Sequence, residues 1–414
     1  MRRIGPGPAE RLAALVRCRT VSDPDEFDAG EFTRFRDVLA AAYPLMHTRL
    51  ELTIYPDGTL LWKWPGRSAS RPMVLMAHHD VVPAPSEGWS RDPFAGDILD
   101  GRVWGRGTLD DKGALVCLVE AVEEALEDGV VPAHDVWVLS GADEEIEGHG
   151  ARRAADDLRV GGVRPWLVCD EGGAIVPDEV ADGGQVLGLV GIAEKGTVDV
   201  DLLARGHGGH SSMPEPEGAV LRLARAVVAV EEAEVDDTAA PELAALAEPL
   251  TALGPVARTG ARTTMAVTRL AGSPGDNVLA TRARAHVNVR LAPGDDRRAL
   301  RSRLEDLVGP HAVEVESLHG DDPSRVAPAH GAAWQHLCSA ARSGDERVEV
   351  APYVMPGSTD ARFFASWCDA VYRYLPLEMD AAQRRSLHGI DEQVSIDSLL
   401  RGIGFYRSLV RGQW

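Results

Sequence analysis

The sequence predicts an α/β protein with two domains: a doubly wound, mixed but mostly parallel sheet with helices on both faces, and an inserted α+β domain. Short, wholly apolar runs alternate with helical stretches early in the chain, as in parallel sheets that are buried on both faces. The middle of the chain instead shows strands with an apolar residue at every second position. A length of 414 residues also exceeds the usual size of one core.

The larger domain is expected at residues 1–191 and 319–414. Apolar runs predict buried strands at residues 73–77, 136–139 and 166–169, with another strand at 371–375. Two strand-like runs, at 50–55 and 59–64, flank the turn Pro56-Asp57-Gly58 and predict a hairpin. Helical spacing of apolar residues predicts helices at 9–16, 32–42, 112–128, 150–159 and 396–410.

The inserted domain is expected at residues 192–318. Its predicted elements follow the order β-α-β-β-α-β, at residues 197–204, 219–231, 262–270, 284–290, 297–308 and 312–317. This order is typical of a small ferredoxin-like domain, in which two helices cover one face of an antiparallel sheet. The Ala/Glu-rich residues 232–255 are expected to form a mobile connection or a short helix.

Composition limits the partners. A net charge of −21 argues against nucleic acid and against anionic membrane surfaces, because both require basic patches. The chain has no apolar run of roughly 20 residues that could span a bilayer, and its first residues do not resemble a signal peptide. Five cysteines without a CxxC pair are typical of a reducing compartment. We therefore expect a cytoplasmic protein.

Histidines and acids follow the predicted strands, at the positions where parallel strands bring their carboxyl ends together. They occur in the segments MAHHDVVP, GRGTLDDKG, SGADEE, CDEGG and LHGIDEQV, and the candidates are His78, Asp80, Asp110, Glu144, Glu145, Glu171 and His388. Imidazole nitrogen together with carboxylate oxygen suits zinc, and Co²⁺ or Mn²⁺ can use similar ligands. The pattern predicts a site for divalent metal.

Each motif also has an ordinary explanation. A histidine at a strand end can be purely structural, and either Asp110 or Asp111 can cap the helix that follows. Three adjacent acids such as Asp143-Glu144-Glu145 commonly form a solvated loop. His388 by itself is uninformative. The combination of motifs, each at a strand end, favours the metal site.

Five motifs in order, AHHDVVP, WGRGTLDDKG, DEE, DEGG and EKG, resemble one family of co-catalytic zinc hydrolases. That family includes aminoacylase-1, succinyl-diaminopimelate desuccinylase, acetylornithine deacetylase, carnosinases and carboxypeptidase S. The resemblance covers nearly the whole chain. It is greatest to the branch that contains carboxypeptidase S and secreted N-acyl-amino-acid hydrolases.

The resemblance implies a role for each candidate. One zinc ion would be held by His78 and Glu171, the other by Glu145 and His388, and Asp110 would bridge the two. Asp80 would orient His78, and Glu144 would act as general base on a hydroxide shared by the metals. Asp170 is an alternative to its neighbour Glu171. The peptide bond between Asp110 and Asp111 is expected to be cis, as in other family members.

The resemblance also implies residues on the substrate side. His210 corresponds to a histidine of the inserted lid domain that stabilises the oxyanion in the partner subunit, which implies a homodimer, or at least a lid that closes over the metals. Asn277, Arg290 and Thr359 match positions that contact substrate, with Arg290 binding a carboxylate. Asn288 stands where the family often has Asp, and a surface arginine is the alternative role for Arg290.

The expected function is therefore hydrolysis of an amide bond next to a free carboxylate in a small molecule, either a peptide or an N-acyl amino acid. One alternative is an aminopeptidase or dipeptidase of the same fold, which would need an acid to bind a free α-amine. Another is a catalytically inactive binding protein, although none of the expected ligands is missing. A dinuclear phosphoesterase is disfavoured because no basic or glycine-rich phosphate-binding loop accompanies the acids.

Overall fold

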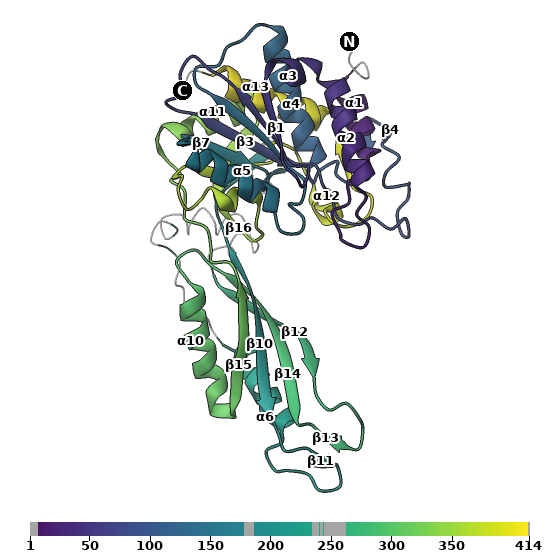
Figure 1. The fold of residues 1–414 in the computed structure, drawn as a ribbon, viewed down its shortest axis with the longest axis vertical. Helices are drawn as coiled ribbons and strands as arrows, with labels where there is room; N and C mark the ends of the chain where they lie inside the picture. The colour runs from purple at the N-terminus through teal and green to yellow at the C-terminus, as the bar shows by residue number, and fades with distance from the viewer. Residues whose placement is uncertain (1–6, 178–185, 234–239, 241–242, 244–261, 413–414) are drawn as a thin grey trace. The chain divides into compact units, whose positions relative to one another are not determined.

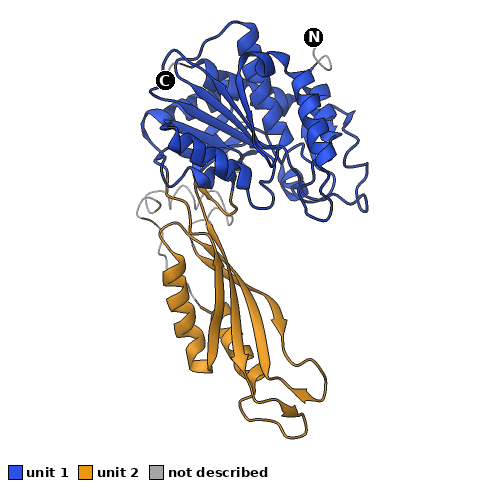
Figure 2. Ribbon diagram, viewed as in Figure 1, with its two compact units in different colours: residues 1–192, 327–352, 359–414 blue, residues 193–326, 353–358 orange. Residues whose placement is uncertain are grey.

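A computed structural model describes residues 7–177, 186–233, 240, 243 and 262–412. The chain folds into two compact units (Figure 2). Unit 1 contains Met1–Ile192, Ala327–Pro352 and Thr359–Trp414, and unit 2 contains Ala193–Val326 and Tyr353–Ser358. Each unit has its own sheet and its own apolar core.

Unit 1 contains a nine-stranded sheet with the order β1-β2-β6-β3-β7-β17-β9-β16, with β8 pairing to β9 (Figure 1). The central neighbours β6–β3, β3–β7 and β7–β17 are parallel, whereas β1–β2, β2–β6 and β17–β9 are antiparallel. The strands are β1 Glu51–Ile54, β2 Leu60–Trp64, β3 Met73–His78, β6 Val136–Gly141, β7 Leu167–Asp170, β8 Ala174–Pro177, β9 Val186–Glu194, β16 Val348–Met355 and β17 Val371–Arg373.

Helices cover both faces of this sheet. Strand β3 is buried along its whole length, and its side chains alternate between the faces. Val74 and Met76 share a core with α5 (His149–Val160), and the opposite face of β3 is covered by α4 (Lys112–Glu127). Further helices are α1 Pro8–Val16, α2 Ala29–Ala42, α3 Pro44–Arg49, α11 Gly331–Gly344, α12 Ala381–Ser386 and α13 Ile396–Arg411. The doubly wound, mixed α/β prediction is confirmed.

A second, three-stranded sheet in unit 1 was not predicted. Its order is β18-β5-β4, with β4 Asp97–Leu99, β5 Arg102–Trp104 and β18 Gln393–Ser395. Antiparallel pairing of β18 with β5 joins the segment before Asp110 to the segment after His388. These two candidate ligands therefore come from neighbouring loops although they lie far apart in sequence.

Unit 2 has the predicted β-α-β-β-α-β order. Its antiparallel sheet has the strand order β12-β14-β10-β15. Alternate residues of β10, such as Val198 and Val200, enter a core that also contains Leu223 of α6 and Leu304 of α10, while the other sheet face carries polar side chains. The elements are β10 Gly196–Arg205, β11 Gly209–His210, α6 Ala219–Glu231, β12 Thr264–Ala271, β13 Val278–Leu279, β14 Arg282–Leu291, α10 Arg297–Val308 and β15 Val313–Gly320.

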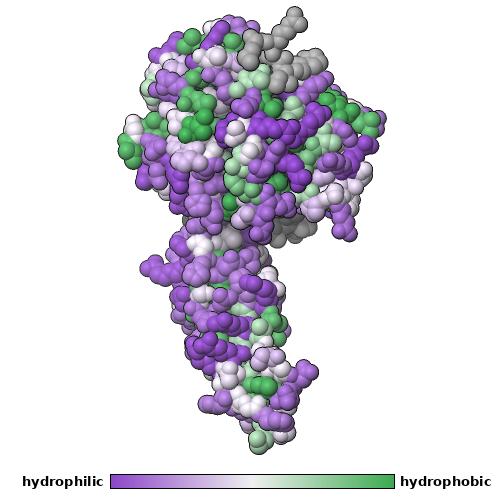
Figure 3. Space-filling view, turned by 45° about the vertical axis from the view of Figure 1, so that its right-hand side comes forward, coloured by the Kyte–Doolittle hydropathy of each residue, from purple (hydrophilic) through white to green (hydrophobic). Residues whose placement is uncertain are grey.

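Most of residues 232–255, expected to be a connection or a short helix, lie outside the described residues. Within the part of the chain that the structure describes, every helix is too short or too polar to cross a membrane. Hydrophilic and hydrophobic residues are interspersed on the face shown in Figure 3.

Candidate active site

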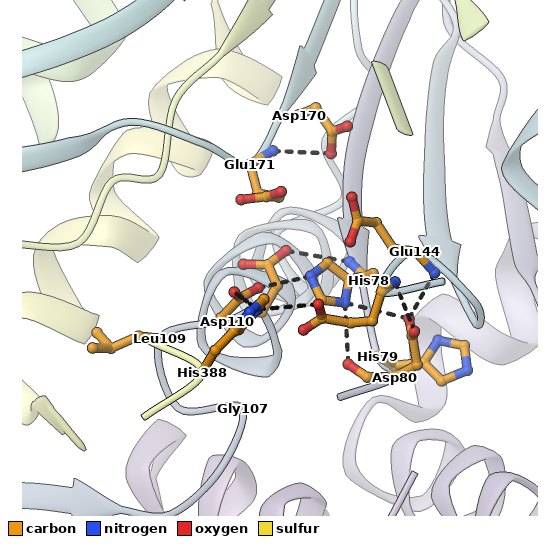
Figure 4. Close-up of polar contacts among 12 residues, drawn as sticks. His78, His79, Asp80, Gly107, Leu109, Asp110, Glu144, Asp170, Glu171 and His388 are labelled. Atoms are coloured by element: carbon orange, nitrogen blue, oxygen red, sulfur yellow. Dashed lines mark hydrogen bonds and ion pairs between the residues drawn. The ribbon is translucent and has the colours of Figure 1, made fainter. Parts of the chain in front are cut away.

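The candidate ligands gather where the central parallel strands end. Strand β3 ends at His78, β6 is followed by Glu144 and Glu145, and β7 is followed by Glu171. Because β6, β3 and β7 are parallel neighbours, these ends lie at one edge of the sheet (Figure 4). The sheet alone therefore brings together residues from three distant segments.

His78 lies between two aspartates. Its Nε2 is 2.9 Å from Asp110 Oδ1. Its Nδ1 lies 3.1 Å from the backbone oxygen of Asp80 and 3.3 Å from Asp80 Oδ1. Because Asp80 accepts the proton on Nδ1, Nε2 is left to act as a ligand, which is the usual arrangement for a metal-binding histidine.

His388 approaches the same carboxylate from the other side. Its Nε2 lies 3.1 Å from Asp110 Oδ2 and 3.0 Å from Glu145 Oε2. Asp110 therefore presents one oxygen to each imidazole. The ligand atoms of His78, Asp110 and Glu145 lie within 4.8 Å of one another, a spacing compatible with metal binding. The peptide bond between Asp110 and Asp111 is cis, as the resemblance implied.

Asp80 also fixes the two glutamates that follow β6. Its carboxylate is fully buried and accepts the backbone N–H of Glu144 at 3.2 Å and that of Glu145 at 3.1 Å. The same side chain therefore orients His78 and positions the segment that carries Glu145. The carboxylate of Glu144 makes no hydrogen bond among the described residues.

The structure distinguishes between the two acids after β7. Asp170 is buried, and its carboxylate accepts the backbone N–H groups of Glu171 at 2.9 Å and Ala361 at 2.7 Å. Glu171 instead directs its carboxylate toward Asp110 and His78 (Figure 4). Glu171 is therefore the better candidate ligand, whereas Asp170 shapes the loop.

Asp111 does not cap helix α4 with its side chain, although it occupies the N-cap position. Its Oδ2 accepts the backbone N–H of His78 at 3.2 Å. The side chain therefore fixes the end of β3, and the capping explanation does not hold for Asp111.

The charges of the site are strongly coupled. Hydrogen bonds to Asp110 and Glu145 raise the pKa of His388 to about 10. Burial opposes the charge of His78, but its hydrogen bonds to Asp110 and Asp80 still raise its pKa well above the ordinary value. Burial and the nearby negative charges raise the pKa of both Glu144 and Glu171 well above the usual range. The site places several carboxylates close together, and a bound cation would reduce the repulsion between their negative charges.

The donor set fits a pair of divalent metal ions. Two imidazoles and three carboxylates are nitrogen and oxygen ligands of the kind that zinc prefers. Glu145 Oε1 is buried without a hydrogen-bond partner among the described residues, so it remains available to a metal. His388 is more than half exposed, which leaves this end of the site open to solvent.

Metal binding is expected to release protons at neutral pH. The pKa values of both imidazoles are raised, to about 10 for His388, which favours their protonated forms at pH 7 when no metal is bound. An imidazole must be neutral to bind metal, so binding should release one proton from each, and affinity should rise with pH up to about 10. Calorimetric titration with Zn²⁺ in buffers of different ionisation enthalpy measures this release. A binding enthalpy that does not depend on the buffer would contradict it.

Comparison with known proteins decides the family. A model of peptidase family M20/M25/M40 matches residues 74–412. The chain belongs to this family. The resemblance inferred from the motifs is confirmed, and the protein is a metal-dependent hydrolase of amide bonds.

Individual relatives agree with this M20 assignment. A probable carboxypeptidase S-like 2 from Dictyostelium discoideum is 30% identical over 97% of this chain and 84% of its own length. The human N-fatty-acyl-amino acid synthase/hydrolase PM20D1 is 31% identical over 82% of this chain and 74% of its own length. The crystal structure of an M20 family metallo-carboxypeptidase from Sulfolobus solfataricus has a TM-score of 0.73 at 17% identity, covering 98% of this chain and 99% of that one, which shows the shared fold.

Two of the expected substrate-side residues of this M20 protein lie together in unit 2. Strand β11 pairs with β13, so that His210 is opposite Val278, and Ser211 N donates to Asn277 O at 3.1 Å. Both His210 and Asn277 are exposed. Arg290 lies elsewhere in the same unit, on the polar face of β14, and Thr359 is fully buried in unit 1.

Two residues without a predicted role lie close to candidate site residues. Glu392 is fully buried and hydrogen-bonds to the segment that carries Asp110. Lys195 is buried in unit 2 near Arg290, and burial followed by the charge of Arg290 lowers its pKa to about 8. Lys195 belongs to the EKG motif, which was the available signal. Glu392 follows His388 by four residues, but nothing in its sequence context indicates burial.

Proposed function

We propose that this M20 protein is a dinuclear zinc hydrolase that cleaves an amide bond next to a free carboxylate, as a carboxypeptidase or an N-acyl-amino-acid deacylase does. The observation that carries the proposal is the position of Asp110, with one oxygen facing His78 and the other facing His388. A carboxylate in this position can bridge two cations. Co²⁺ or Mn²⁺ could replace zinc because they share these ligands.

Each side chain then has a distinct role. His78 and Glu171 would hold one metal, His388 and Glu145 the other, and Asp110 both. Asp80 would keep the Nδ1 proton of His78 in place. A pair of zinc ions bound here would supply Lewis acidity, which lowers the pKa of water toward neutrality and polarises the scissile carbonyl.

Glu144 is the proposed general base. Its backbone N–H donates to Asp80, and its carboxylate makes no hydrogen bond with other described residues. It would take a proton from the attacking water and deliver it to the nitrogen of the scissile amide as the C–N bond breaks. A pKa raised by burial suits a carboxylate that must hold this proton for part of the cycle.

His210 is the proposed oxyanion donor. Ser212 donates its backbone N–H to Nδ1 of His210 at 3.1 Å, and the Ser212 hydroxyl lies 2.8 Å from the same nitrogen. A neutral imidazole that accepts at Nδ1 carries its proton on Nε2. This N–H is free to donate to the oxygen that becomes negative in the transition state.

A homodimer is supported by the surface of unit 2. Helix α6 exposes the apolar residues Val220, Leu221 and Val228, which are 50%, 43% and 51% exposed. Strand β12 lies at the edge of the sheet, where its outer backbone groups can pair with another strand. We propose that these features mediate self-association and that His210 serves the active site of the second copy.

His210→Ala is expected to lower kcat by about 10²–10³-fold, the usual effect of losing one oxyanion donor, without changing metal content. His207→Ala, in the same loop, is the control and should keep activity. If His210 acts on the partner's site, mixing His210→Ala with Glu144→Gln should restore activity, because mixed dimers contain one intact site. A monomer by analytical ultracentrifugation would contradict the dimer.

Substrate carboxylate recognition is assigned to Arg290 and Lys195. Arg290 Nη1 donates to Thr197 Oγ1 at 2.7 Å and Nε donates to Asn288 Oδ1 at 3.3 Å, and both of these partners are neutral. The ion pairs formed among the described residues include neither Arg290 nor Lys195. Two neighbouring cations without an acidic partner favour an anionic ligand.

Arg290→Ala is expected to raise KM for substrates with a free carboxylate by about 10- to 100-fold, as loss of charge-assisted hydrogen bonds does. Substrates whose carboxylate is blocked as an amide should be affected little. Arg284→Ala is the matched control, since Arg284 lies on the same strand but pairs with Glu316 at the exposed surface. Equal effects on both substrate types would contradict the assignment.

A substrate panel with metal analysis tests the proposed function as a whole. The zinc-loaded protein should hydrolyse N-acyl amino acids or C-terminal peptide bonds. Exclusive hydrolysis of peptides with a free α-amine would instead indicate an aminopeptidase or dipeptidase, and metal binding without turnover would indicate an inactive binding protein.

A reducing, cytoplasmic location is proposed from the five cysteines, which are all buried and unpaired.

A further inference from the structure

One buried carboxylate connects the two segments that carry Asp110 and His388. Glu392 Oε1 accepts the backbone N–H groups of Leu109 at 2.7 Å and Asp110 at 3.2 Å. Glu392 Oε2 accepts the backbone N–H of Gly107 at 3.1 Å and Arg106 Nη1 at 2.7 Å. All four donors belong to residues 106–110, so the carboxylate of Glu392 organises the whole Asp110 segment.

Two further hydrogen bonds join the same segment to backbone oxygens of the His388 loop. Arg106 Nη2 donates to the backbone oxygen of Gly389 at 2.8 Å, and Gly105 N donates to the backbone oxygen of Glu392 at 2.9 Å. Arg106 is 2% exposed and Glu392 is 0% exposed, so the ion pair between them is shielded from solvent. The guanidinium also lies over the ring of Trp89, 5.3 Å from its centroid.

The His388 segment needs such support. His388 and Asp391 both have left-handed backbone conformations, with φ of 56° and 58°, which residues other than glycine rarely adopt. Such conformations persist where the surrounding structure holds them. Asp391 is held by Ser90, whose N and Oγ donate to Oδ1 at 2.8 Å. Arg106 and Glu392 hold the rest of the segment.

We propose that Glu392 is a positioning residue for metal binding, which sets the separation of Asp110 and His388 by holding both of their segments with Arg106. The inference rests on the proposed function, in which Asp110 and His388 bind metal. Glu392 does not bind metal itself, because its two oxygens already accept four hydrogen bonds. It acts through the backbone of Asp110 and through the loop of His388.

Glu392→Gln tests this role with little change in shape. A glutamine amide replaces one acceptor oxygen by a donor, so in either orientation two N–H groups of residues 106–110 would face another N–H group. The affinity for Zn²⁺, measured by competition with a chromogenic chelator, is expected to fall about 10- to 100-fold, as it does when an outer partner of a metal ligand is lost. With excess Zn²⁺, kcat should recover toward the wild-type value.

Glu120→Gln is the matched control. Glu120 is 1% exposed and forms a buried ion pair with Arg11, and it also accepts the hydroxyl of Tyr43 at 2.9 Å. This pair joins α4 to α1. The same substitution there should lower thermal stability but leave the affinity for Zn²⁺ unchanged. Equal Zn²⁺ affinities for Glu392→Gln and Glu120→Gln would overturn the proposal.

Arg106→Lys provides a second variant if Glu392→Gln does not fold. A lysine ammonium keeps the charge beside Glu392 but lacks the fork that also reaches Gly389. Zn²⁺ affinity should again fall, and unchanged affinity in this folded variant would overturn the proposal. Wild-type protein that binds no Zn²⁺ would instead reject the proposed function, so the two failures are distinguishable.

Discussion

Glu144→Gln is expected to lower kcat by about 10²–10⁴-fold, the usual contribution of a general base, and to leave the metal content unchanged. The amide cannot take a proton from water, but the groups that hold the metals do not depend on it. The hydrogen bond from Glu144 to Asp80 is made by the backbone N–H, which the substitution keeps, so the loop should keep its conformation. Steady-state kinetics with elemental analysis of the same sample measures both quantities.

Glu147→Gln is the control for this experiment. Glu147 lies three residues further along the same segment and has an exposed side chain. Its substitution should affect neither kcat nor metal content. An active Glu144→Gln variant would rule out the proposed base. Loss of metal from that variant would instead show that Glu144 acts as a ligand.

The pH dependence of the wild-type protein gives an independent view of Glu144. A general base must be deprotonated to act, and burial raises the pKa of this carboxyl well above its ordinary value. The ascending limb of kcat/KM against pH should therefore lie above the range of an exposed glutamate, and it should be absent from the residual activity of Glu144→Gln.

Long periodic elements could be predicted from the sequence because their own residues carry the signal. Strand β3 is apolar throughout because both of its faces are buried, and helix α10 was predicted at its observed bounds, Arg297–Val308. Strands β4, β5 and β18 have three residues each, too few to show a period. Unit 2 also includes Tyr353–Ser358, which begin inside strand β16 (Val348–Met355) and give no local sign of this association.

In the candidate site, too, residues with a local sequence signal were predicted and a residue that depends on distant contacts was not. His78, Asp110, Glu145 and His388 were identified because histidines and acids beyond strand ends are unusual together, and the structure brings them into contact. Glu392 was not identified, because an acid in the polar segment LHGIDEQV appears solvated. Its burial results from β18 pairing with β5, a contact between residues about 290 positions apart. A contact between segments so far apart in sequence leaves no local pattern from which the burial of Glu392 could be predicted.

Asp110→Asn is expected to have the largest effect, a loss of both metals and a fall in activity of more than about 10³-fold, beyond that of a single oxyanion donor. Asp110 faces both imidazoles, so the neutral amide removes the anionic bridge from two ions at once. Elemental analysis of the purified variant should find close to none of the metal that the wild type retains.

Two further variants separate bridging from general disruption of the site. Glu171→Gln should weaken binding of the metal ion beside His78, and His388→Ala should weaken binding of the metal ion beside Glu145. Each variant should therefore retain about one metal. Asp110→Asn that still binds one metal would show that the carboxylate serves a single ion. Loss of both metals from all three variants would show that the ions bind only as a pair. A bridge at Asp110 with separate ligands on either side is supported only if Asp110→Asn retains no metal while Glu171→Gln and His388→Ala each retain about one.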